Sequence, residues 1–154
     1  MDCFKAMSGG LIVLALQACA SVPIASPQEQ AAATQFQASH DKGVLYVYRK
    51  DQFQGGGIIY PIVVNGQLVG SLKAGTFLRT EITPGQVQVS SFTTTAQSVF
   101  PLTIQAGEIK FISTAYHVSA GSVILGIAGN ISLVESHDAT ARSDIKALKL
   151  TVSR

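Results

Sequence analysis

The chain after Gly43 constrains the fold most strongly, because short stretches rich in Val, Ile, Thr, Tyr and Phe alternate there with turn residues. Stretches of this kind, bounded by glycine, proline, asparagine and aspartate, are typical of antiparallel strands. We therefore predict strands over eight ranges: Val44–Arg49, Ile58–Asn65, Gln67–Leu72, Thr76–Ile82, Gln86–Phe92, Val99–Gln105, Glu108–His117 and Ile131–Glu135.

Two of the connections between these stretches have the residues of tight turns. Asn65-Gly66 is the pair that favours a type I′ turn, whose twist matches that of a hairpin. Pro84-Gly85 combines a fixed φ with a residue that is free to adopt a positive φ. The first pair therefore predicts a hairpin, and the second predicts a turn.

Apolar residues alternate most clearly at Phe100, Leu102 and Ile104, which predicts one buried and one solvated strand face. Other predicted strands are apolar on both faces. Burial on both faces suits two sheets packed together, or a sheet covered by a helix.

The last part of the chain, Ala139 to Leu148, has helical spacing. Three apolar residues fall on one face of this helix: Ala141, Ile145 and Leu148. Asp138 can pair with Arg142 one turn later, and Ser136 or Asp138 would cap the helix. The predicted fold is mainly β: an antiparallel β-sandwich of about seven or eight short strands over residues 43–154, with a short C-terminal helix.

The first 18 residues have the composition of a signal peptide. Lys5 precedes the apolar stretch Leu11–Leu16, and small residues follow it. The apolar stretch is far shorter than the roughly 20 residues that span a bilayer. We therefore expect residues 1–18 to be removed during export.

The end of this leader, Leu16-Gln17-Ala18-Cys19, resembles the lipobox of bacterial lipoproteins. The resemblance implies that Cys19 is acylated, becomes the mature N-terminus and attaches the protein to a membrane. In the same terms, Ala20 after the cysteine resembles the pattern that is sorted to the outer membrane. The alternative is an ordinary signal cut after Ala20, because Ala18-Cys19-Ala20 is also an A-x-A pattern.

Residues 19–42 contain mainly Ala, Gln, Ser and Pro and few side chains that could fill a core, which is typical of a tether. Ser26-Pro27-Gln28-Glu29, however, combines an N-cap serine, an N1 proline and a capping-box glutamate. Phe36 is a large apolar side chain that could dock such a helix. The sequence leaves a flexible tether and a docked helix open.

No catalytic, metal or cofactor site is predicted. The three histidines, His40, His117 and His137, are too scattered for a zinc motif, and we expect His117 at a strand end and His137 at a helix start. The stretch Gly121–Gly129 lacks the lysine of a phosphate-binding loop, so we interpret it as an apolar connection. It could alternatively contact a membrane or a partner protein.

One aromatic and basic surface is a candidate binding site. Tyr46 and Tyr48 share a strand face, and Arg49 and Lys50 follow at its end, so these residues could bind a glycan or peptide of the envelope. Core packing is the alternative use of the two tyrosines.

Several segments of the β region resemble a bacterial lipoprotein family, the domain of unknown function 2846, and the related PEGA-type β module. The segments are Gly43–Arg49, Val64–Gly70, Gly75–Leu78 and Pro84-Gly85. The resemblance implies an envelope protein with an all-β domain, and it implies no substrate.

The sequence favours a membrane-anchored, non-enzymatic binding or structural module at the periplasmic face of the outer membrane. The net charge of +2, without a block of like charges, gives no reason to expect a nucleic-acid partner. The alternative is an envelope hydrolase whose site is assembled from distant acids such as Glu81, Glu108 and Glu135.

Overall fold

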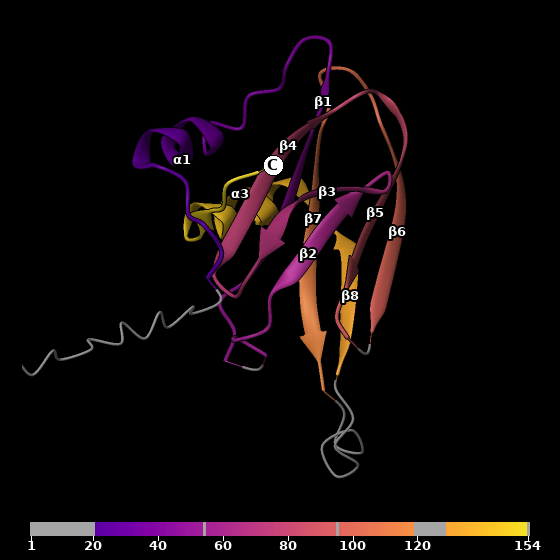
Figure 1. The fold of residues 1–154 in the computed structure, drawn as a ribbon. Helices are drawn as coiled ribbons and strands as arrows, with labels where there is room; N and C mark the ends of the chain where they lie inside the picture. The colour runs from indigo at the N-terminus through magenta and orange to yellow at the C-terminus, as the bar shows by residue number, and fades with distance from the viewer. Residues whose placement is uncertain (1–20, 54, 95, 119–128, 154) are drawn as a thin grey trace, which may run out of the picture.

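Two β-sheets and two helices form the part of the protein that the structure describes (Figure 1). The computed structural model describes residues 21–53, 55–94, 96–118 and 129–153. The elements are α1 (Pro27–Ala33), β1 (Gly43–Arg49), β2 (Tyr60–Val64), β3 (Gln67–Leu72), β4 (Thr76–Ile82), β5 (Gly85–Phe92), β6 (Gln97–Ile104), β7 (Ile109–His117), β8 (Asn130–Glu135), α3 (Asp138–Lys146) and β9 (Lys149–Leu150). The strands of one sheet lie in the order β8-β7-β1-β4-β9, and those of the other in the order β3-β2-β5-β6.

The mainly β fold is confirmed, and eight of the strands lie where the run pattern predicts them. The two sheets are mostly antiparallel, as predicted, but β1 pairs with β7, and β4 with β9, in parallel. Between β1 and β7 the chain crosses twice to the four-stranded sheet and back. Local run patterns position strands, but they do not determine which strand the chain meets when it returns.

Both predicted turns contain a residue with a positive φ, although β4 and β5, on either side of Pro84-Gly85, lie in different sheets. Asn65 has a φ of 49° and Gly66 a φ of 81°, as a type I′ turn requires, and this turn joins β2 to β3. Gly85 has a φ of 138° at the start of β5. Because L side chains rarely adopt such angles, glycine suits both positions.

The core between the two sheets is mainly aliphatic. It contains Leu45 and Val47 of β1, and the burial of Ile104 with partly buried Phe100 and Leu102 confirms the predicted alternation in β6. The other buried members of this core are Tyr60, Ile62, Val64, Leu72, Leu78, Ile82, Val87, Val89, Ile112, Ile131 and Leu133.

A second core lies on the outer face of the five-stranded sheet, where helices α1 and α3 cover it (Figure 1). Its members include a group of aromatic rings on neighbouring elements: Phe36, Tyr46, Phe77 and Phe111. Strand β1 is therefore buried on both faces.

Helix α3 packs as its spacing predicts, with Ala141, Ile145 and Leu148 buried, and Arg142 Nε donates to Asp138 Oδ1 at 2.7 Å. The predicted cap is wrong. His137 is the N-cap residue and makes no side-chain capping bond. Ser136 Oγ instead accepts a hydrogen bond from the Tyr48 hydroxyl, and Asp138 faces Arg142.

The segment before β1 is packed against the domain. Of the two alternatives that the sequence leaves open, the docked helix is therefore present and the flexible tether is not. Ser26 and Glu29 form the predicted capping box of α1. Phe36 is 8% exposed, and its ring lies 5.4 Å from that of Tyr46. Within the described ranges, neither helix reaches the length and apolar content that crossing a bilayer would need.

Backbone hydrogen bonds also hold this segment against the C-terminal part of the chain. The packed domain therefore begins well before residue 43, where the composition predicts its start. Ala25 N donates to Leu150 O at 2.9 Å, and Val152 N donates to Pro23 O at 3.0 Å. The side-chain amide of Gln30 continues this pattern, since it donates to Leu148 O and accepts from Leu150 N. The described packing therefore begins at Val22, which is buried.

Candidate functional site

The predicted surface of Tyr46, Tyr48 and Arg49 is not formed. All three side chains are buried. Tyr46 and Tyr48 do share a face, but that face lies under the helices, and Arg49 points to the opposite side, between the sheets. Alternation along a strand explains the separation, because adjacent residues face opposite ways. The two tyrosines are packed in a core, which is the alternative that the sequence leaves open.

Arg49 closes one end of the inter-sheet core. Its Nη1 donates to Ile58 O at 2.7 Å, and its Nη2 donates to Gly55 O at 2.6 Å. The guanidinium carbon lies 4.1 Å from the centre of the Tyr60 ring. No carboxylate pairs with it among the described residues, and burial lowers the pKa of the guanidinium from its ordinary value. Arg49 thus holds the segment after β1 against the sandwich.

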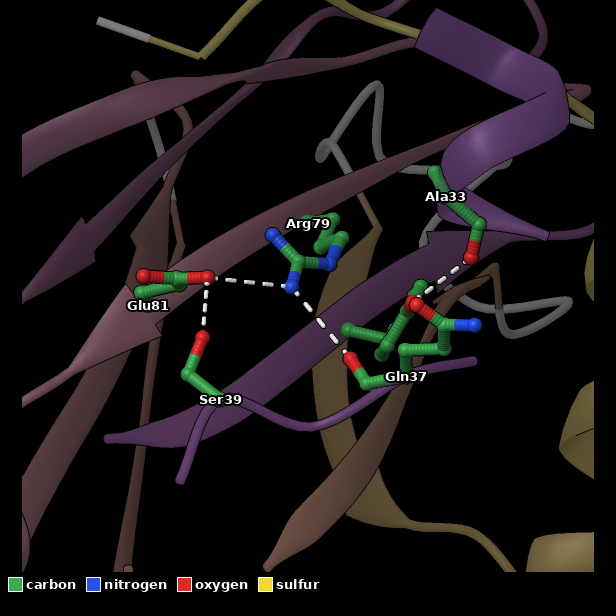
Figure 2. A network of polar contacts seen from close by, with 6 residues as sticks. Ala33, Gln37, Ser39, Arg79 and Glu81 are labelled. Atoms are coloured by element: carbon green, nitrogen blue, oxygen red, sulfur yellow. Dashed lines mark hydrogen bonds and ion pairs between the residues drawn. The ribbon is translucent and has the colours of Figure 1, made fainter. Parts of the chain in front are cut away.

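The three acids named for a hydrolase site are all held in ion pairs, Glu81 with Arg79 and both Glu108 and Glu135 with Lys110. Glu81 Oε1 accepts from Ser39 Oγ at 2.5 Å and from Arg79 Nη2 at 3.1 Å (Figure 2). These two hydrogen bonds lower the pKa of Glu81. Glu108 and Glu135 both pair with Lys110, at 3.3 and 2.8 Å, and they raise the pKa of this lysine. Each acid is therefore part of a surface ion pair.

The histidines lie apart as well. His117 ends β7, and its Nε2 lies 3.0 Å from Ser132 Oγ. His137 begins α3, and His40 is exposed before β1. No three His, Cys, Asp or Glu side chains gather as metal ligands in the part of the chain that the structure describes.

The glycine-rich stretch falls mostly outside the described residues, which resume at Gly129. Gly129 N donates to the Tyr116 hydroxyl at 2.6 Å. A Cβ atom at this position would lie 2.3 Å from His117 O, which no side chain tolerates. Close backbone approach therefore requires glycine at 129.

Two grooves flank helix α1. The first, of about 420 Å³, is lined by ten residues: Ala25, Glu29, Ala32, Ala33, Gln37, Arg79, Leu150, Thr151, Val152 and Ser153. Figure 2 shows its polar side, where Arg79 Nη2 reaches both Glu81 and the carbonyl of Gln37. The charge of Arg79 is thus already balanced by Glu81.

The second groove, of about 680 Å³, lies on the other side of α1. It is lined by Ile24, Ala25, Pro27, Gln30, Ala31, Thr34, Lys146 and Lys149. Lys146 and Lys149 are exposed, and neither has an acidic partner among the described residues. This groove is therefore apolar on its floor and positively charged at its rim.

Sequence reasoning missed this groove because it requires the docked segment. The signal that could have found it is Val22-Pro23-Ile24, in which β-branched residues flank a proline that an edge strand tolerates. Cys19, the predicted lipid attachment residue, lies outside the described residues, only two positions before the first of them.

Comparison with known proteins places the sandwich in a family. The model of the family described as protein of unknown function (DUF2846) matches residues 39–127. The chain belongs to this family. The match includes β1 to β7 and leaves out α1, α3 and the residues that line the second groove.

An uncharacterized protein of Haemophilus influenzae is 31% identical to the chain over 103 residues, which cover 66% of this chain and 60% of the relative. The match thus spans about three fifths of that relative's length. No solved structure matches this chain.

Proposed function

We propose that this protein is a lipoprotein of the bacterial envelope, held to the membrane by acylated Cys19, and that its domain works by binding or structural contact. The observation that carries the proposal is the short chain between the lipobox and the packed domain. Val22 is already buried, and at about 3.6 Å per residue it lies within about 11 Å of Cys19. Cleavage before Cys19 would leave the whole packed unit intact.

The non-enzymatic role is supported by how the polar side chains are used. Glu81, Glu108 and Glu135 take part in ion pairs, and Arg49 bonds backbone carbonyls. The description of the family names no activity. In the proposed location, which follows from Ala20, the domain faces the periplasm from the outer membrane and meets an envelope protein or glycan there.

Metabolic labelling with a fatty acid tests the anchor. We expect label on the wild-type protein and on Cys3→Ala, the matched control in the removed leader, and no label on Cys19→Ala. Mass spectrometry should find a mature chain that begins at acylated Cys19. An unlabelled, secreted protein that begins at Ser21 would show that the ordinary signal is used and would refute the proposal.

Crosslinking in cells tests the binding role. Photoreactive residues on the solvated face of the four-stranded sheet, at Gln86 or Thr103, should capture a defined envelope component. Capture no greater than that of an unrelated lipoprotein would count against a binding module.

A further inference from the structure

The charged groove beside α1 lies close to the proposed lipid anchor. We propose that this groove, between α1 and the residues Lys146 and Lys149, is the membrane-facing surface of the domain and contacts the headgroups of anionic phospholipids. The inference rests on the proposed function, because it requires the lipid on Cys19.

The length of chain between anchor and groove supports this orientation. Ile24 lines the groove and follows Cys19 by five residues, so the two are separated by at most about 18 Å. Ile24 cannot swing away from the domain, since Pro23 and Ala25 on either side are bonded to Val152 and Leu150. The anchor therefore restricts which surface of the domain can approach the bilayer.

The chemistry of the groove suits a bilayer surface. Ile24 is 41% exposed, and Ala25, Pro27 and Ala31 extend this apolar floor. Partly exposed apolar side chains next to lysines are typical of surfaces that lie in the headgroup region.

Two lysines without ion pairs lie together at the rim of this groove. Four other cations have acidic partners within 4 Å, namely Lys50, Arg79, Lys110 and Arg142, whereas Lys42 and Lys73 also lack one among the described residues but do not line the groove. Lys146 and Lys149 have no such partner among the described residues, so their charge is available to phosphate groups. Because the lipid on Cys19 would hold the groove at the surface, weak contacts suffice.

The test uses the full acylated protein in vesicles of phosphatidylethanolamine and phosphatidylglycerol. A spin label is attached at Ala31→Cys in the groove or, as the control, at Gln88→Cys on the outer face of the four-stranded sheet. Acylation blocks Cys19, and Cys3 is removed with the leader, so only the new thiol is labelled. Flotation of the vesicles reports the anchor separately from the orientation.

We expect the label at residue 31 to be shielded from a water-soluble nickel chelate and accessible to oxygen, and the label at residue 88 to be fully accessible to the chelate. Equal accessibility of both labels in protein that floats would overturn the orientation while leaving the anchor intact. Protein that does not float would refute the anchor, and the inference with it.

The headgroup assignment has its own control. Shielding at residue 31 should decrease in vesicles of neutral phosphatidylcholine and in the variant K146E/K149E, while flotation is unchanged. Unchanged shielding in both cases would overturn the role of anionic headgroups.

Discussion

The two faces of β1 show two different ways to build a core. On the inner face, Leu45 and Val47 meet side chains of the second sheet, and all members of that core lie between residues 45 and 133. On the outer face, Tyr46 packs against the ring of Phe36 from the chain before β1, and Ile145 of the C-terminal helix belongs to the same core. The inner core therefore belongs to the strands alone, whereas the outer core requires both ends of the chain.

This difference gives the segment at residues 22–36 a structural role. Without it, the aromatic side chains on the outer face of the five-stranded sheet would be exposed to water. The same segment begins three residues after Cys19, the proposed lipid attachment residue. Packing and proposed anchoring thus depend on the same residues.

The comparison is tested most strongly by truncating one side chain in each core. Leu45→Ala should lower the free energy of unfolding by about 3 kcal/mol, and Phe36→Ala by about 2 kcal/mol, because a buried cavity is formed in each case. Urea denaturation measures both values. Hydrogen exchange should show that Phe36→Ala mainly exposes α1, while Leu45→Ala affects every strand; the reverse pattern would contradict the division into two cores.

Arg49 tests how the inner core is closed. Arg49→Met removes the donors to Gly55 O and Ile58 O and should destabilise the protein by about 2 kcal/mol, since both carbonyls lose a charged donor. Limited proteolysis should then cut the segment after β1 faster. Cleavage at the wild-type rate would show that Arg49 does not hold this segment.

The hydroxyl of Tyr46 tests how the outer core holds α1. It donates to Ala33 O at 2.6 Å, and burial raises the pKa of this tyrosine. Tyr46→Phe should cost about 1 kcal/mol and increase exchange in α1. Tyr48→Phe is the matched control, because its hydroxyl bonds Ser136 near α3 and its loss should leave exchange in α1 unchanged.

The smallest expected effect concerns the surface contact of Glu81 with Ser39 and Arg79. In the folded protein the pKa of Glu81 is lowered from its ordinary value of 4.5. The contact of the Glu81 carboxylate therefore stabilises the fold fully at a pH above 4.5, and this stabilisation is lost as the pH falls through the pKa of the folded state. The difference in unfolding free energy between wild type and Glu81→Gln should therefore shrink in acid. A difference that does not depend on pH would show that the carboxylate charge is not involved.

The inner core could be predicted from sequence because its information is local. Alternation at Phe100, Leu102 and Ile104 and the turn at Asn65-Gly66 depend on neighbouring residues only. The parallel pairing of β1 with β7 could not be predicted in this way, because it depends on where the chain returns from the other sheet.

The candidate groove was harder to predict, because docking of the N-terminal segment uses groups that composition does not reveal. Backbone atoms of Pro23 and Ala25 and the side-chain amide of Gln30 make the contacts. A segment of small and polar residues therefore has the composition of a tether even though it is docked.

The prediction that Arg49 shares a surface with Tyr46 and Tyr48 is wrong for a simpler reason. It depends on position along the strand alone, whereas the side chain of Arg49 faces the other sheet.

Hydrogen exchange at residues 22–36 in the acylated protein tests the central claim, that the chain is packed from Val22 onward. The amides of Ala25, Thr34 and Val152, which donate to backbone carbonyls, should exchange far more slowly than in an unfolded peptide, together with the strands of the outer core. Exchange of Ala25 and Thr34 at the rate of an unstructured chain, while β1 stays protected, would show that the segment is a tether and would contradict the account.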